Sequence, residues 1–429
     1  MLPHLITEIP GPRSRELAVK LRAHESRNVT FIADDWPVFW QRAKGTNVWD
    51  ADGNRFLDLT SAFGVASLGH TNAAVRDALV MQAGALMHAM GDVHPTAVKT
   101  ELCARLSALT FERWNAGTGK TILGNSGFEA VEAALKTSLL HTGKPGVIAF
   151  KGGYHGLGFG AVAATGLPFF REPFRAQLKD FATFVPFPKS AVALPSLRSE
   201  IESVIASREI GSILVEPVQG RGGCIVPPCE FLPMLRAICD AHKILLIADE
   251  IYTGFNRTGA LFACDHSGTV PDLVCLGKAL TGGFPLSACV GRADVMDAWP
   301  DSSGEALHTS TFLGNPLGCA MALASLNAHA DPQVAAHVRE RGAHFTAALA
   351  ALHLGEVRGP GLMLGIELVK ADGQPDGERA IAIVKAALRA GLLLLTDGPA
   401  GNVLSFAPPF AIDDTETAFV AETLGNVTT

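Results

Sequence analysis

The chain has 429 residues, of which 48% are hydrophobic and 18% charged, with 44 glycines. That length exceeds what one small core accommodates, so we expect two or more lobes. The net charge of -7, without a basic block, argues against nucleic acid as a main partner. The eight cysteines form no C-x-x-C pair, and no window has the make-up of a signal peptide or a membrane span. We therefore expect a soluble, cytoplasmic protein with reduced thiols, no metal site and no membrane contact.

The first 60 residues are typical of an arm rather than of a domain. The polar stretch 13–27 predicts a surface helix, and an Asp-Gly pair between alternating apolar residues predicts a hairpin over 48–59. A small-residue loop is expected at 61–65. Helical apolar spacing then predicts helices over 73–86 and 95–109.

From residue 121 the pattern becomes strand-then-helix. Strands are predicted over 121–123, 146–150, 212–215, 244–247, 273–276 and 285–290, and helices over 129–140, 231–242 and 317–330. This alternation indicates a mostly parallel sheet with helices on both faces.

After about residue 331 the pattern indicates a separate, smaller α+β domain. Its predicted elements are helices over 334–352, over 380–390 and from 413, and strands over 363–368, 392–395 and 403–406. We thus expect an arm and hairpin at 1–60 that belong to the small lobe, a large domain at 61–330 and the small domain at 331–429.

Two apolar runs end in residues of opposite charge. The run 244–247 leads to Asp249 and Glu250, and the run 273–276 leads to Lys278. Open α/β sheets bind ligands at the carboxyl ends of their strands. An aspartate can keep a pyridine nitrogen protonated and a lysine can form an imine with an aldehyde, which are the two requirements of pyridoxal phosphate. Each residue alone is more often a helix cap or a solvated charge.

Two glycine-containing loops follow predicted strands. At 124–130 the hydroxyl of Ser126 and a helix N-terminus have the build of a phosphate cup, although an ordinary N-cap with Glu129 at N3 fits the same letters. At 151–156 the ring of Tyr154 lies between glycines, where it can stack on a flat ligand or fill a tight turn of the core.

Two further loops carry polar groups. Glu216 ends a predicted strand before a glycine-rich loop in which Arg221 can grip a carboxylate, or simply form a surface salt bridge. The loop 308–316 offers hydroxyls ahead of a helix that starts at Pro316. No G-x-G-x-x-G follows a first strand, which argues against a nicotinamide dehydrogenase.

Taken in order, these features resemble the class III (ω-amino acid) aminotransferases of PLP fold type I. The resemblance runs from WDADGN at 49–54 to FAPPF at 406–410. It is carried by DEIYTGFNRTG, by the lysine 29 positions after the aspartate (278 − 249) and by STFLGNP. It implies pyridoxal 5'-phosphate as cofactor and an α/β fold: a large domain with a mostly parallel sheet flanked by helices, plus a smaller α+β domain.

The resemblance also implies roles for single residues. Lys278, Asp249 and Tyr154 would be catalytic: Lys278 would hold the cofactor as an internal aldimine and move a proton, and Asp249 would pair with the pyridinium nitrogen. Ile251 and Tyr154 would pack against the two faces of the ring. Further cofactor contacts would come from Ser126, Gly127, Phe128, His155, Glu216, Tyr252 and, from the neighbouring subunit of a homodimer, Thr311.

Four positions depart from the better-known members of this family. Tyr252 stands where many have glutamine. Leu157 and Ser405 stand where GABA- and ornithine-type members have arginines, and Arg221 replaces a glutamate. Our hypothesis is that Arg221 has taken over carboxylate binding, and that Leu157 and Phe63 make one side of the substrate pocket apolar.

The implied function is transfer of an amino group from an amine or ω-amino acid to a 2-oxo acid. An amino-acid racemase or a 1,2-aminomutase on the same scaffold stays open, because no motif separates them, and a non-catalytic PLP-binding protein is a remote alternative. No motif specifies the donor, the acceptor, the stereochemistry or the choice between dimer and tetramer.

Overall fold

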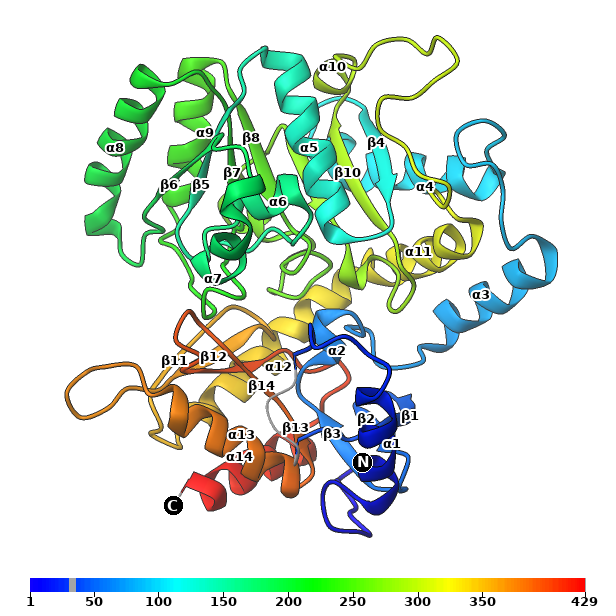
Figure 1. The fold of residues 1–429 in the computed structure, drawn as a ribbon, viewed down its shortest axis with the longest axis vertical. Coiled ribbons are helices and arrows are strands. Elements are labelled where there is room, and N and C mark those ends of the chain that lie inside the picture. Colours follow the sequence, from blue (N-terminus) through cyan, green and yellow to red (C-terminus); the bar gives the residue numbers. More distant parts are fainter. Residues whose placement is uncertain (31–35, 429) are drawn as a thin grey trace. The chain divides into compact units, whose positions relative to one another are not determined.

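The structure is a computed structural model that describes residues 1–30 and 36–428. It divides into two compact units. The large unit is Ala73–Val338, and the small unit combines Met1–Asn72 with Arg339–Thr429 (Figure 1). The arm and hairpin expected at residues 1–60 lie in the small unit, together with residues from the C-terminal part of the chain.

A seven-stranded sheet forms the centre of the large unit. In spatial order its strands are β4 (Gly119–Gly124), β10 (Ser287–Arg292), β9 (Leu273–Leu276), β8 (Leu245–Asp249), β7 (Ile210–Val215), β5 (Gly146–Phe150) and β6 (Ala182–Val185). β10 runs antiparallel to its neighbours β4 and β9. The strands β9, β8, β7, β5 and β6 pair with one another in parallel. The sheet is therefore mostly parallel, as predicted. β6 was not predicted.

Helices cover both faces of this sheet. The helices of the large unit are α3 (Ala73–Ala85), α4 (Ala97–Ser107), α5 (Gly127–Thr142), α6 (Phe159–Ala164), α7 (Pro168–Arg171), α8 (Leu194–Ser207), α9 (Phe231–His242), α10 (Ala293–Met296) and α11 (Pro316–His329), and α12 (Pro332–Ala350) continues into the small unit. Successive side chains of a strand point to opposite faces. In β8, Leu246 joins a core with α4, α8, α9 and α11, whereas Leu245 and Ile247 join a core with α5, α6 and α10. Because both faces of β8 are buried, its sequence is a continuous apolar run and does not alternate with polar residues.

The small unit contains two four-stranded sheets. One consists of β1 (Trp40–Lys44), β2 (Asn47–Asp50), β3 (Arg55–Asp58) and β13 (Leu392–Leu393), and the other of β11 (Glu356–Arg358), β12 (Leu364–Glu367), β15 (Val403–Phe406) and β14 (Leu395–Asp397). Its helices are α1 (Pro12–Arg22), α2 (Ser61–Gly64), α13 (Gly377–Arg389) and α14 (Asp414–Thr428). The predicted hairpin is present as β2 and β3, with Gly53 at φ +88° in the turn.

The loop predicted at 61–65 contains the short segment α2, whose interior does not have the backbone angles of a right-handed helix. Ser61, Ala62 and Phe63 have φ of +48°, +50° and +64°. Such left-handed conformations cost L-residues about 1–2 kcal/mol each. The carboxylate of Asp58 holds the segment, since it accepts hydrogen bonds from the backbone N–H groups of Thr60 and Ala62 (2.8 and 3.2 Å). A conformation fixed by one buried side chain leaves no periodic signal.

All eight cysteines lie in the part of the chain that the structure describes; none of them forms a disulfide, and six are buried. Among the described residues no cluster of three or more His, Cys, Asp or Glu side chains could hold a metal ion. Within the same residues, no helix combines the length and hydropathy needed to cross a membrane.

Candidate active site

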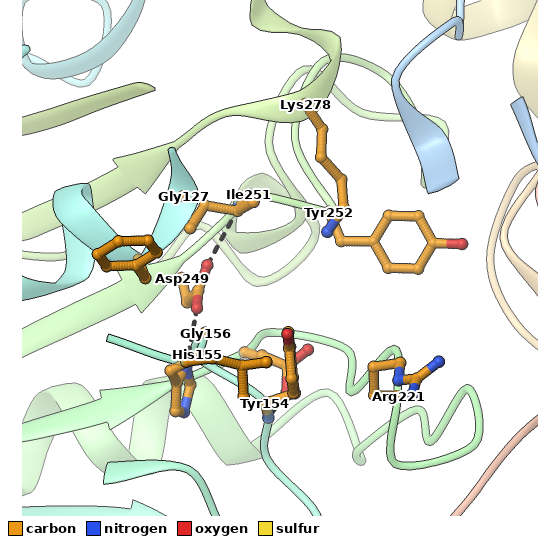
Figure 2. Close-up of a pocket in the computed structure, with 12 residues that line it drawn as sticks. Gly127, Tyr154, His155, Gly156, Arg221, Asp249, Ile251, Tyr252 and Lys278 are labelled. Carbon is orange, nitrogen blue, oxygen red and sulfur yellow. Dashed lines mark hydrogen bonds and ion pairs between the residues drawn. The ribbon is translucent and has the colours of Figure 1, made fainter. Parts of the chain in front are cut away.

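A pocket of about 440 Å³ lies in the large unit (Figure 2). Its lining residues are Gly127, Phe128, Tyr154, His155, Gly156, Leu157, Glu216, Arg221, Asp249, Ile251, Tyr252 and Lys278. Most come from segments that follow the carboxyl ends of β5, β7, β8 and β9, where a mostly parallel sheet presents its ligand site. The volume is within the range of small-molecule sites.

Asp249, the last residue of β8, is the buried anion of the pocket, with 4% of its surface exposed. Its Oδ2 accepts a hydrogen bond from His155 Nδ1 (2.7 Å), and its Oδ1 accepts one from the backbone N–H of Ile251 (3.2 Å) (Figure 2). Because a carboxylate can only accept, the His155 proton that faces it is on Nδ1. Both oxygens of Asp249 are thus engaged, and the carboxylate is held in place at the base of the pocket.

Two apolar side chains face each other across the pocket. Ile251 lies on one side and the ring of Tyr154 on the other (Figure 2). A Cβ on Gly127 would come within 3.0 Å of the Ile251 side chain, so glycine lets helix α5 begin against this wall. Gly156 has φ +106°, and a Cβ there would lie 2.4 Å from that of Phe128. Only glycine lets the loop after β5 approach α5 so closely.

Lys278 follows β9 and begins a short 3₁₀ turn with φ +44°, a conformation that is strained for a lysine. Its Nζ lies 4.5 Å from the centre of the Tyr252 ring. An ammonium over a tyrosine face is attracted by the ring quadrupole. Tyr252 therefore contacts the lysine through its ring.

Ser126 and the first turn of α5 form the candidate phosphate cup. Ser126 is the N-cap residue, but its side chain makes no capping hydrogen bond. Its Oγ is buried and has no hydrogen-bond partner among the residues described. Glu129 reaches back to the backbone N–H of Asn125 rather than to that of Ser126. The ordinary capping-box alternative is therefore not formed. A buried hydroxyl beside a helix N-terminus is suited to an anion.

Glu216 ties two loops of the site together. Its two oxygens accept hydrogen bonds from the backbone N–H groups of Tyr154 (2.8 Å) and Gly220 (3.1 Å). Burial raises the pKa of Glu216 to about 7. Nearby Asp249 raises it further, and His155 and the two backbone bonds oppose the shift. Burial also raises the pKa of the Tyr154 phenol, which Arg221 opposes.

The titration of Glu216 should make the stability of the protein depend on pH. Because the folded-state pKa lies above the usual 4.5, the folded state binds this proton more tightly. The stability it contributes is complete below the unfolded pKa and is lost as pH rises through about 7. We expect the free energy of unfolding to fall by about 3 kcal/mol more in the native protein than in Glu216→Gln between about pH 5 and about pH 8.

Urea unfolding of the cofactor-free protein at the two pH values measures this difference. Exposed Glu230→Gln is the matched control and should follow the native protein. Equal pH dependence in Glu216→Gln and the native chain would contradict the raised pKa.

The structure places the other predicted site residues in different regions. Leu157 and Arg221 line the pocket. Thr311 is an exposed residue of the large unit and does not line it. Phe63, 59% exposed, and Ser405, in β15, belong to the small unit. Their predicted roles toward substrate stay predictions.

Two features of the site were missed. Gly156 lines the pocket and approaches α5 closely. In the sequence the only indication of this approach is that a glycine follows Tyr154 and His155. Phe170 packs edge-on against Tyr154, with ring centres 5.4 Å apart. The consecutive aromatics Phe169 and Phe170 were the available hint.

The sequence model of the family "Aminotransferase class-III" matches residues 31–427 of the chain. The chain is a class III aminotransferase. It is 36% identical to a 4-aminobutyrate aminotransferase of Mycobacterium leprae, over 96% of this chain and 94% of that protein. It is 34% identical to a 5-aminovalerate aminotransferase of Pseudomonas putida, over 88% and 90%.

Solved structures of similar proteins agree with the assignment of this chain to the aminotransferase family. A PLP-bound amine transaminase from an uncultivated Pseudomonas species superposes with a TM-score of 0.86 at 29% identity, and covers 94% of this chain and 98% of its own. An aminotransferase of Bacillus anthracis gives 0.89 at 26% identity, over 97% and 98%. The fold expected from the sequence is thereby confirmed.

Proposed function

We propose that this aminotransferase uses pyridoxal 5'-phosphate to move an amino group from an amine or ω-amino acid to a 2-oxo acid. The observation that supports the proposal is that Lys278 and Asp249 line one pocket, together with the side chains of Ile251 and Tyr154. When bound, the cofactor supplies an aldehyde to capture amines and a ring that accepts electrons. The overall reaction needs no oxidant or reductant: the donor carbon loses an amino group and a hydrogen and gains an oxygen from water, and the acceptor carbon gains the amino group and a hydrogen and releases its oxygen as water.

The residues present fit this cofactor. Ser126 Oγ, with the N–H groups of Gly127 and Phe128, would hold the phosphate, because that buried hydroxyl lacks a partner among the described residues and lies at a helix N-terminus. Asp249, fixed by His155, would hold the pyridine nitrogen protonated. Ile251 and Tyr154 would sandwich the ring, and Tyr252 and Glu216 would lie at its edge.

Lys278 has two tasks in this proposal. Its amine would bind the cofactor covalently and would afterwards carry a proton to and from the reacting carbon. The Tyr252 ring, 4.5 Å from Nζ, positions the amine at the pocket. Tyr154 faces the pocket from the wall opposite Ile251 and helps to exclude water from that face.

We also propose that the enzyme is a cytoplasmic homodimer in which Thr311 reaches the partner's phosphate cup. Support comes from an apolar surface on the segments 87–93 and 307–312, the second of which contains Thr311. Its members are at least 59% exposed and comprise Met87, Met90, Val93, Leu307 and Phe312. The two segments that carry it are joined by hydrogen bonds from Thr309 to Asp92 (2.7 Å) and from Asn315 to Met87 (3.3 Å). A second copy that covers this surface would bury it. Eight cysteines without a disulfide among them fit a reducing compartment.

The near-visible spectrum of the purified enzyme tests the proposed chemistry. Added pyridoxal 5'-phosphate should give a visible absorbance that bleaches when an amino donor is supplied. Release of an oxo acid separates transfer from a racemase or 1,2-aminomutase, which need no oxo-acid acceptor. A spectrum that never shows the bound cofactor would refute cofactor use.

Mixing two damaged subunits tests the role of Thr311. In a heterodimer of Lys278→Ala and Thr311→Ala, a threonine that acts on the partner's site leaves one site with both residues intact. We therefore expect activity at limiting cofactor to rise above that of either variant alone. If Thr311 acts within its own subunit, both sites carry a defect and mixing restores nothing. Ser303→Ala, in the same exposed loop, is the control for an inert substitution.

A further inference from the structure

We propose that Arg221 is the substrate-carboxylate site of this enzyme, so that both the amino donor and the oxo acceptor carry a carboxylate bound there in turn. The inference rests on the proposed function and deepens it, because it selects amino acids over simple amines as donors. It is carried by the position of the guanidinium in the pocket, by the rings that hold it and by the charges around it.

Several hydrogen bonds restrain the loop that carries Arg221. It follows β7, and Gln219 and Ile225 pair across its base through two backbone hydrogen bonds (3.1 and 3.0 Å). Gly220 donates to Glu216, and Cys224 donates to the carbonyl of Gly220 (3.0 Å). A loop closed in this way fixes where the arginine side chain leaves the backbone.

Two aromatic rings flank the guanidinium. Its central carbon lies 6.0 Å from the centre of the Tyr154 ring and 5.9 Å from that of Phe170. The two rings pack edge-on against each other. Guanidinium groups stack well on aromatic faces, which lowers the entropy lost when they bind an anion. The rings therefore present the planar fork of Arg221 to the pocket.

The charges of the pocket set the orientation of a substrate. Asp249 and Glu216 each accept two hydrogen bonds and are fixed in the wall. Arg221 lines the same pocket, and in the view of Figure 2 it points to the side of Lys278 away from Asp249. A carboxylate is attracted by the positive charge of Arg221. It therefore binds on the Arg221 side, with its amino or oxo group toward Lys278.

An apolar side chain completes this part of the pocket. Leu157 lines it with 51% of its surface exposed. A substrate with a carboxylate and a hydrophobic remainder matches the pair of Arg221 and Leu157. In a transfer with two half-reactions, one such site serves the donor and then the acceptor, so both must carry the same anionic group.

The test uses the cofactor-loaded enzyme and three variants: Arg221→Gln, Arg221→Lys and, as a matched control, Arg175→Gln. Arg175 is an exposed arginine that does not line the pocket. Propionate, which has no amino group to react, is titrated by calorimetry. We expect Arg221→Gln to bind propionate about tenfold or more weakly, since it removes charge-assisted hydrogen bonds. Arg221→Lys should recover part of the affinity, and the control should bind as the native enzyme does.

A second readout separates recognition from structure. Alanine and 2-aminobutane differ in having a carboxylate or an ethyl group on the amino-bearing carbon. In Arg221→Gln the concentration of alanine that half-bleaches the cofactor should rise about tenfold or more, with the 2-aminobutane reaction unchanged. Unchanged propionate binding, or equal losses with both donors, would overturn the proposal. A native enzyme without cofactor absorbance would instead refute the proposed function.

Discussion

Replacing Lys278 by alanine is expected to remove the visible absorbance of the bound cofactor and to lower turnover by about 10⁴-fold or more. The amine is both the covalent anchor and the proton carrier of the proposed mechanism, so no neighbour can take over both tasks. Lys278 is also the lysine that lines the pocket. The variant should fold, because the side chain reaches into a cavity and not into a packed core.

Absorbance spectra after dialysis against excess cofactor and single-turnover measurements with alanine check this expectation. Lys278→Arg keeps the charge but cannot form an imine, and it should fail in the same way. Lys151→Ala, an exposed lysine at the end of β5, is the matched control and should keep full absorbance. Retention of the covalent absorbance in Lys278→Ala would assign the anchor to another lysine.

Replacing Asp249 by asparagine should have the second-largest effect. The amide has the shape of the carboxylate and keeps one oxygen that can accept the Ile251 N–H, while its NH2 can face His155 Nδ1 only if the ring proton moves to Nε2. It carries no charge to hold a pyridine nitrogen protonated. We expect turnover to fall by about 10³-fold, comparable to the loss of one preorganised electrostatic partner elsewhere. The absorbance of the covalently held cofactor should persist, because Lys278 is untouched.

Rapid-mixing kinetics of the half-reaction with alanine measure this loss. Asp180→Asn, an exposed aspartate outside the pocket, provides the comparison and should react at the native rate. Turnover of Asp249→Asn within about tenfold of the native rate would show that the ring nitrogen does not depend on this charge.

Most of the large unit could be predicted from the sequence because its signals are local. The buried strands β8 and β9 are short apolar runs that end at Asp249 and just before Lys278, and α9 has the helical spacing of a half-buried helix. The phosphate-cup prediction depended on Ser126 at a strand-to-helix junction, which the structure shows as the N-cap of α5. These features need only neighbours in the chain.

The features that escaped prediction depend on contacts between distant residues. The bond between His155 and Asp249 joins residues 94 positions apart. The raised pKa of Glu216 comes from burial that the assembled loops create. Neither leaves a mark in periodicity or composition.

The topology of the large sheet has a consequence for how the protein forms. β4, which leads into Ser126 and the cup, is an edge strand whose sheet partner is β10, with Gly124 opposite Ser287. β10 is synthesised long after β4, so the cup cannot be set in place until the last strand of the sheet has paired. Such distant pairing is slow, and the unfinished sheet leaves an edge open to aggregation. A cofactor that binds only the finished site stabilises it by mass action. Cofactor supply during expression will therefore raise the yield of native protein.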